Sequence, residues 1–193
     1  MSPRPADGTR RVAATRTQQT IFLIDGSHYD RLRSVLESPF DLSALAHIAS
    51  NGAPLDHAIY YRDVRDESEE ARQRSLFGWL KHNGFMVKGR RHSSGEPRER
   101  YGTNLVELAV DALLLAHSGD RVLILAADAK LAPLLAALRD DDIDVTLIST
   151  EDAPNTIAPA RHLIENANRF LELKSVLEWI ALGGPRGGPE NAS

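Results

Sequence analysis

The apolar run Ile21–Ile24, which ends in Asp25, constrains the fold of this chain more than any other stretch. Its residues are rich in β-branched and aromatic types, and such a run predicts a short strand that is buried on both faces, as in a parallel sheet. The run stops abruptly at a carboxylate, a glycine and two polar residues, Ser27 and His28. An acid at the carboxyl end of a buried strand stands where open α/β sheets bind their ligands. We therefore expect a functional site at Asp25.

Two later segments also place acids beside apolar runs. The run 122–125 leads through two alanines into Asp128. The apolar-faced segment 104–116 predicts a helix that carries Glu107 and Asp111 at positions i and i+4, and such a pair projects from one helix face. We expect Asp25, Asp111 and Asp128, assisted by Glu107, to meet at one end of a single sheet. The alternative is that these acids cap helices and lie on solvated faces.

The rest of the chain alternates strand and helix patterns. Further short apolar runs, which predict strands, lie at 57–61, 85–87 and 145–148. Segments with helical spacing lie at 29–36, 41–50, 66–82, 133–139 and 161–180, the last with a break near 166–168. This alternation predicts an α/β fold with a mostly parallel central sheet and helices on both faces.

Length and composition indicate one domain with two extensions. We expect a disordered basic arm over 1–19, a globular domain over 20–182 and a flexible tail over 183–193. The absence of cysteine excludes disulfides, thiolate zinc sites and cysteine nucleophiles, and it is typical of the reducing cytoplasm. The arm lacks the apolar core of a secretory signal, and no run reaches the ~20 apolar residues of a membrane span. A cytoplasmic protein that does not contact membranes is therefore expected.

The acids suggest a particular chemistry if they converge. Carboxylates in close proximity repel one another and raise each other's pKa unless a cation neutralises them. Oxygen ligands without nearby histidine suit Mg²⁺ or Mn²⁺, hard ions that also bind phosphate oxygens. Such an ion can orient a water and stabilise the leaving oxygen of a phosphodiester.

A locally basic segment precedes the acidic helix. Its cationic side chains are Lys88, Arg90, Arg91, Arg98 and Arg100. Lysine and arginine supply most of the non-specific affinity of proteins for nucleic acids, so this segment predicts binding to the RNA backbone. The alternative is a solvated surface loop.

Two residues after the first strand fit the same picture. Ser27 and His28 are predicted to position a phosphate or a water next to Asp25. The alternative is a turn whose side chains cap the following helix.

The order of three motifs resembles the NYN domain, a PIN-like nuclease group that includes the bacterial LabA-like proteins. The motifs are Phe22–Ser27, Leu108–Leu113 and Leu123–Asp128 followed by Ala132–Leu135. The resemblance extends over most of the globular part. It implies a Rossmann-like PIN fold and, in active members, cleavage of RNA that depends on Mg²⁺ or Mn²⁺, with Asp25, Asp111 and Asp128 as the carried-over acids.

Three positions depart from the pattern of this family. His28 stands where an asparagine is common, Asn104 replaces an acid at the start of the acidic helix, and Lys130 replaces the second acid of the third motif. If Lys130 points inward, it takes the place of a second metal, pairs with Asp25 or Asp128 and weakens metal binding. If it points outward, it is placed to hold a phosphate.

Two hypotheses follow. The first is a divalent-metal-dependent ribonuclease in which Asp25, Asp111 and Asp128 hold the ion, Glu107 assists catalysis and the basic segment grips single-stranded RNA. The second is a catalytically degenerate NYN domain that serves as an RNA-binding or protein-interaction module. The long apolar helix leaves room for a homodimer.

Overall fold

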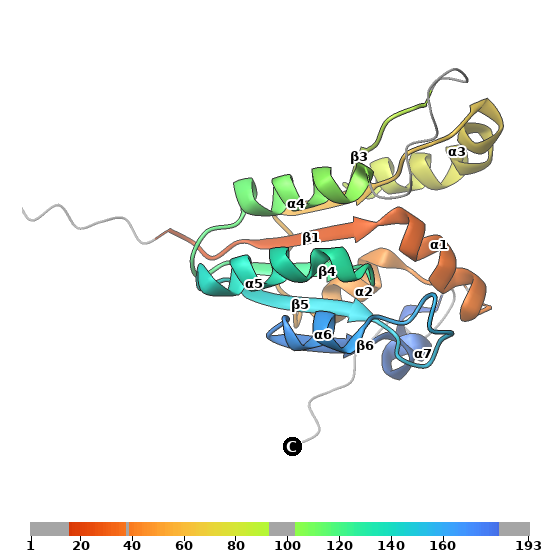
Figure 1. Ribbon diagram of the computed structural model, residues 1–193. Helices are drawn as coiled ribbons and strands as arrows, with labels where there is room; N and C mark the ends of the chain where they lie inside the picture. Colours follow the sequence, from red (N-terminus) through yellow and green to blue (C-terminus); the bar gives the residue numbers. More distant parts are fainter. Residues whose placement is uncertain (1–15, 38, 93–102, 182–193) are drawn as a thin grey trace, which may run out of the picture.

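A computed structural model describes residues 16–37, 39–92 and 103–181. Most of the predicted basic arm and all of the predicted tail lie outside these ranges. Arg98 and Arg100 lie outside them as well. The core is one six-stranded parallel sheet with the order β3-β2-β1-β4-β5-β6 (Figure 1). The strands are β1 (Thr20–Asp25), β2 (His57–Tyr61), β3 (Met86–Lys88), β4 (Arg121–Leu125), β5 (Asp144–Ser149) and β6 (Arg169–Glu172).

Strand β1 lies at the centre of the sheet because its side chains are apolar on both faces. All six of its residues are buried, and it pairs in parallel with β2 on one side and β4 on the other. The chain builds outward from β1 to β3 and then returns to build outward from β4 to β6. The order therefore reverses beside β1, and such a switch point is where open α/β sheets bind ligands at their carboxyl edge.

Helices cover both faces of the sheet. The helices are α1 (Gly26–Val35), α2 (Leu42–Ala49), α3 (Glu67–His82), α4 (Thr103–Leu115), α5 (Ala132–Asp140), α6 (Arg161–Glu165) and α7 (Leu177–Ile180). Apolar side chains of α4, α5 and α6 pack with Ile21 and Leu23 on one face. Those of α1, α2, α3 and α7 pack with Phe22 and Ile24 on the other. Successive β1 residues therefore enter opposite layers, as the pleat requires.

Several acids that end strands or loops act as helix caps. The carboxylate of Asp25 accepts a hydrogen bond from the amide of Ser27 at the start of α1, and Asp41 and Asp66 cap α2 and α3 in similar ways. Asp128 caps the short 3₁₀ helix η1 (Ala129–Leu131) through the amide of Lys130. Such caps satisfy amides that have no partner within the helix. The alternative that these acids cap helices therefore holds for Asp25 and Asp128.

The predicted α/β fold with a parallel sheet and helices on both faces is confirmed, with one local correction. The prediction of helix over 161–180 is wrong at Arg169–Glu172, which form the strand β6. The chain is helical before the predicted break near 166–168, in α6, and helical again after β6, in the 3₁₀ helix η2 (Leu173–Val176) and the short α7. Strand β6 pairs with β5 through register partners such as Leu147 and Phe170. Pairing with a distant strand outweighs the weak local helical spacing. None of the helices in the described ranges is both long and apolar enough to cross a bilayer.

Candidate functional site

Three neighbouring strands end in a row of polar side chains at the carboxyl edge of the sheet. Asp25 of β1 is in register with Tyr61 of β2, and Tyr61 is in register with Lys88 of β3. Tyr61 packs in the layer that contains α4. Because directly paired residues point to the same side of a sheet, the row faces α4. A carboxylate, a phenol and an ammonium group are thus placed together under the acidic helix.

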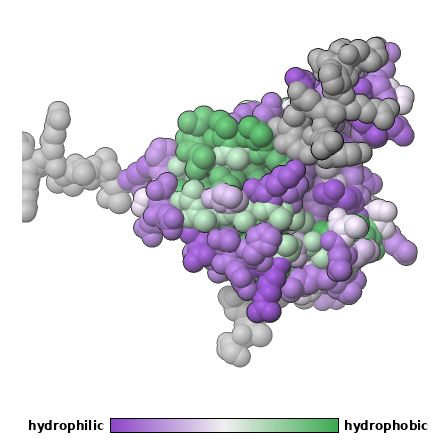
Figure 2. All heavy atoms as spheres, in the orientation of Figure 1, coloured by the Kyte–Doolittle hydropathy of each residue, from purple (hydrophilic) through white to green (hydrophobic). Residues whose placement is uncertain are grey.

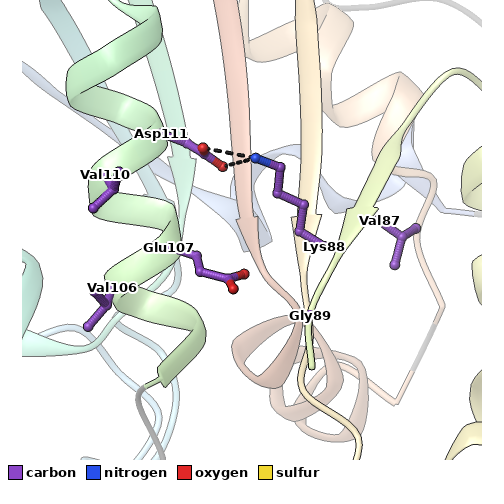
Figure 3. A pocket seen from close by; sticks show the side chains of 7 residues that line it. All are labelled: Val87, Lys88, Gly89, Val106, Glu107, Val110 and Asp111. Carbon is purple, nitrogen blue, oxygen red and sulfur yellow. Dashed lines mark hydrogen bonds and ion pairs between the residues drawn. The ribbon is translucent and has the colours of Figure 1, made fainter. Parts of the chain in front are cut away.

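Asp111 projects from α4 onto this row. The ammonium of Lys88 lies 2.9 Å from Oδ1 and 2.7 Å from Oδ2 of Asp111 (Figure 3). The hydroxyl of Tyr61 donates to Oδ2 at 2.7 Å. The Asp111 side chain is 16% exposed and that of Lys88 is 35% exposed. Burial of the phenol, together with its hydrogen bond to the Asp111 carboxylate, raises the pKa of Tyr61 far above its ordinary value. Asp111 therefore already has a cation and a neutral donor.

A groove of about 490 Å³ lies between β3 and α4 around this pair. Figure 3 shows Lys88 reaching from β3 toward Asp111, with Glu107 beside them. The groove is lined by Val87, Lys88, Gly89, Val106, Glu107, Val110 and Asp111. Glu107 is exposed there, one turn from Asp111, as the helical spacing predicted. The lining of the groove is therefore partly apolar and partly charged.

Asp25 is almost completely buried, at 3% exposure. Burial raises the pKa of its carboxyl, although hydrogen bonds from the His28 and Ser27 amides and the charges of Arg31 and Arg62 oppose the rise. The guanidinium of Arg31 lies 3.9 Å from Oδ2 of Asp25. The sequence analysis missed Arg31, which lies one and a half turns into α1. Its position shortly after the Asp25 cap is the feature from which it could have been found.

Asp128 follows β4, the strand next to β1, and lies at the same edge. Its Oδ1 accepts the amide of Lys130 at 2.9 Å. The side chain of Lys130 is exposed, and it forms no ion pair with another residue of the described ranges. Lys130 therefore points outward, and the cation that pairs with an acid of the site is Lys88 instead.

His28 is not available as a contact for RNA, which corrects the prediction. Its side chain is fully buried, and Nε2 lies 3.0 Å from the hydroxyl oxygen of Ser149 at the end of β5. Nδ1 has no hydrogen-bond partner among the described residues. Burial, together with the charge of Arg31, lowers the pKa of His28 to about 3, so the ring is neutral. His28 joins α1 to β5 inside the protein.

Ser27 is held by a second residue that the sequence analysis missed, Arg62. The guanidinium of Arg62 donates to Oγ of Ser27 at 2.9 Å and to Oε1 of Glu69 at 2.7 Å, and it lies 3.2 Å from Oδ2 of Asp30. Arg62 directly follows β2, the position in a strand–loop junction where ligand-site residues are common. Ser27 is thus anchored beside Asp25 by a network that crosses from α1 to α3.

Two cations of the basic segment are paired with acids in the described ranges. Lys88 binds Asp111, as described above, and Arg91 lies 2.7 Å from Glu67 and 3.6 Å from Glu70 of α3. The amide of Arg90 donates to Asp63. Arg98 and Arg100 lie outside the described residues. The prediction that the segment binds RNA therefore rests on fewer free charges than its composition suggests.

The acids do not form the predicted metal centre in this arrangement. Within the described ranges, no three histidine, aspartate or glutamate side chains are grouped so that they could hold a metal ion. Asp25 and Asp128 cap helices and Asp111 is paired with Lys88. Asn104, which stands in place of a family acid, is buried and donates from Nδ2 to the carbonyl of Tyr61 at 3.3 Å. The residues present therefore do not fit a Mg²⁺ or Mn²⁺ ion that is held by Asp25, Asp111 and Asp128 together.

The fold and this edge define a class of protein. An open parallel sheet in which Asp25 ends β1 and Asp128 follows β4, with the acidic helix α4 packed on one face, is a Rossmann-like α/β domain. The sequence matches the model of the NYN domain over residues 19–175, and the chain belongs to the NYN domain family. This membership associates it with the PIN-like nucleases.

One solved structure shares the fold over nearly its whole length. It is the crystal structure of a protein of unknown function from Vibrio parahaemolyticus, with a TM-score of 0.69 and 19% sequence identity. The alignment covers 88% of this chain and 99% of that one. The comparison with curated proteins found no match to this sequence.

Proposed function

We propose that this chain is an RNA-binding NYN domain whose acidic site no longer supports metal-dependent cleavage. The observation that carries the proposal is the Lys88 ammonium, which contacts both oxygens of Asp111. A divalent ion that bound Asp111 would have to displace this cation and would meet its charge at close range. In this proposal the chain keeps the nucleic-acid-binding surface of a nuclease family and lacks the metal chemistry.

The electrostatics of the whole edge support this proposal. The predicted need for a bound cation arose from repulsion between carboxylates. In the structure the protein supplies cations of its own, because Lys88 faces Asp111, Arg31 approaches Asp25 and Arg62 contacts Asp30 and Glu69. Asn104 and Lys130, which replace two family acids, lower the negative charge further. These pairs offset part of the negative charge that a metal ion would otherwise neutralise.

The carboxyl edge also carries cations that reach solvent. Lys130 is exposed next to Asp128, and the Arg31 side chain is 44% exposed next to Asp25. Both follow strand ends beside the switch point of the sheet, where a ligand of this fold binds. We infer that they contact the phosphates of a single-stranded RNA, with an affinity that falls steeply as salt rises.

A second candidate function is metal-dependent ribonuclease activity of the NYN type, which would need Mg²⁺ or Mn²⁺. The observation that favours it is the position of Asp25 and Asp128, which follow two directly paired strands at one edge. Buried and half-buried acids at this edge are the remnant of the family motif. This candidate predicts cleavage that a chelator abolishes.

The test compares binding and cleavage of one fluorescently labelled single-stranded RNA. Fluorescence anisotropy is measured in chelator and in Mn²⁺ or Mg²⁺, and the same samples are resolved on denaturing gels. We expect binding that chelator leaves unchanged and no metal-dependent cleavage. The double variant Arg31→Ala/Lys130→Ala is expected to bind about 10-fold more weakly or worse, because each lost phosphate contact removes part of the electrostatic affinity.

The matched control is Arg74→Ala, an exposed arginine on α3 that lies outside the proposed surface. It is expected to bind like the parent. Metal-dependent cleavage that is lost in Asp128→Asn would replace the proposal with the ribonuclease candidate. Absence of RNA binding in every condition would end both.

A further inference from the structure

An exposed apolar face on α4 remains unexplained by the proposed function. The large apolar side chains that are exposed in the described ranges come from two neighbouring elements: Met86 of β3 and, on α4, Val106, Val110, Leu113 and Leu114. Their exposed fractions run from 48% for Val110 to 71% for Leu114. Figure 2 shows a continuous green area over α4. An apolar patch of this kind on a soluble domain marks an interaction surface.

The spacing of this face is that of a helix–helix contact. Val106, Val110 and Leu113 are four and then three residues apart, which is the repeat that keeps an apolar seam facing a second helix. The opposite side of α4 is already used, because Leu105, Leu108 and Ala112 are buried against the sheet. The helix therefore has two apolar faces, and only one of them is covered by its own chain in the described part.

The two halves of the face border different features. Leu113 and Leu114 are exposed on its C-terminal half, whereas Val106 and Val110 of its N-terminal half line the groove of about 490 Å³ between α4 and β3. When the helix meets an antiparallel copy of itself, the leucines of each copy come to lie beside the groove of the other. A two-fold axis then forms both contacts at once, which is the property of an isologous interface.

Charge favours the same antiparallel arrangement. The N-terminal half of the face is flanked by Glu107, and the C-terminal half around Leu113 and Leu114 carries no charge. A parallel pair would set Glu107 against Glu107 of the second copy. An antiparallel pair with Val110 at the axis sets Glu107 beside Leu113 and separates the two glutamates by about 9 Å along the helix.

We propose that the exposed apolar face of α4 binds a second copy of this chain, in an antiparallel two-fold dimer centred near Val110. The leucines of each copy lie over the groove of the other. The dimer is independent of RNA binding, since the Arg31 and Lys130 surface belongs to other elements.

The first test is the mass of the full chain in solution. Sedimentation equilibrium is measured from about 1 to 100 µM, the range in which interfaces of modest area associate. We expect a species of twice 21.2 kDa for the parent. The double variant Val110→Glu/Leu114→Glu is expected to raise the dimer dissociation constant at least about 100-fold, because it places carboxylates at the centre of the interface. Its far-UV circular dichroism spectrum should match that of the parent, since both side chains are exposed and the monomer fold does not need them.

The matched control introduces the same carboxylate at an exposed position of another helix, Ser34→Glu on α1. It should leave the dimer intact. A parent that stays monomeric throughout the range, including one whose face is covered by its own undescribed segments, would overturn the proposal. A dimer that the α4 variant does not weaken would overturn it as well.

The second test reports the geometry. The chain has no cysteine, so a single introduced cysteine gives an unambiguous cross-link. Val110→Cys should form an intermolecular disulfide rapidly on mild oxidation, because the two positions meet at the axis. Ser34→Cys should remain monomeric under the same conditions. Equal cross-linking of the two variants would contradict the antiparallel arrangement.

Discussion

The ammonium of Lys88 contacts both carboxylate oxygens of Asp111, at 2.9 and 2.7 Å, across the space between the edge strand and the acidic helix. The hydroxyl of Tyr61 completes the arrangement from the neighbouring strand. An acid that the sequence pattern assigns to a metal is thereby part of an internal ion pair. The consequences of this pair and of three neighbouring networks can be measured.

Replacing Lys88 by methionine is expected to destabilise the fold by about 1–2 kcal/mol, because Asp111 would remain largely buried without its cation. Asp111→Asn in the Lys88→Met background should recover part of this loss, since the unpaired charge is then removed. Urea unfolding at neutral pH measures both values. The control is Arg161→Met, which breaks the exposed Arg161–Glu165 pair and should leave stability unchanged. An equally small effect of Lys88→Met would show that the pair contributes nothing.

Asp25→Asn is expected to stabilise the protein relative to the parent, and more so at pH 7 than at pH 3.5. Burial raises the pKa of Asp25 in the folded state, so the folded protein prefers the protonated carboxyl. The stability that Asp25 contributes is complete below the pKa of the unfolded chain and is lost as pH rises through the folded value. Asparagine keeps the cap oxygen and cannot ionise.

Urea unfolding of Asp25→Asn and the parent at both pH values provides the measurement. Asp41→Asn, which alters the cap of α2 in the same way, controls for the loss of charge at a helix start. A difference between Asp25→Asn and the parent that is the same at both pH values would contradict the prediction.

His28 is expected to make the fold sensitive to acid. Its pKa is held at about 3 by burial, well below the ordinary value of 6.5, so the unfolded chain binds a proton that the folded chain refuses. The stability linked to His28 is complete above pH 6.5 and falls by up to about 1.4 kcal/mol per pH unit as pH drops from 6.5 toward 3. The free energy of unfolding of His28→Gln should therefore depend less on pH in this window.

Nitrogen NMR of the histidine rings gives an independent reading. The His28 ring should remain neutral at pH 5, with the solvent-exposed histidines as an internal reference. A His28 signal that titrates together with theirs would show that the ring is accessible and would restore it as a surface contact.

Arg62→Lys is expected to cost about 1–3 kcal/mol of stability, although the charge is retained. A lysine cannot reach Ser27, Glu69 and Asp30 at once as the guanidinium does. Glu69, which is 4% exposed, would lose a partner inside the protein. Arg65→Lys on the same carboxylate, with a largely exposed side chain, is the control and should have a smaller effect. Thermal unfolding of the two variants measures the difference, and equal losses would refute a special role for Arg62.

The strand–helix pattern could be predicted because it follows from the local periodicity of apolar residues. The run that forms β1 and its terminal Asp25 lie where the sequence indicated, as do the helix that carries Glu107 and Asp111 and the strand that leads to Asp128. The prediction failed at Arg169–Glu172, because a four-residue strand at the sheet edge has little periodicity of its own. Its pairing partner, β5, is distant in sequence.

The site could be predicted only as a set of residues. The acids were found from their positions after apolar runs, but the identity of their partners was not. Lys130, two residues after Asp128, was the cation considered for an inward ion pair, whereas the ion pair is made by Lys88, 23 residues before Asp111. Arg62 was missed because nothing near it in the sequence marks it as the partner of Ser27, 35 residues away.

The sequence by itself therefore determined the class of fold and the edge of the sheet at which Asp25 and Asp128 lie, since both follow from hydrophobic periodicity and from residues next to strand ends. The order of three motifs indicated the family. Only the tertiary structure decided which charges neutralise one another, that His28 is buried and that one face of α4 is left uncovered. The physical reason is that charge pairing and burial depend on distances between segments that are far apart in the chain, and a parallel sheet joins such segments through long crossovers.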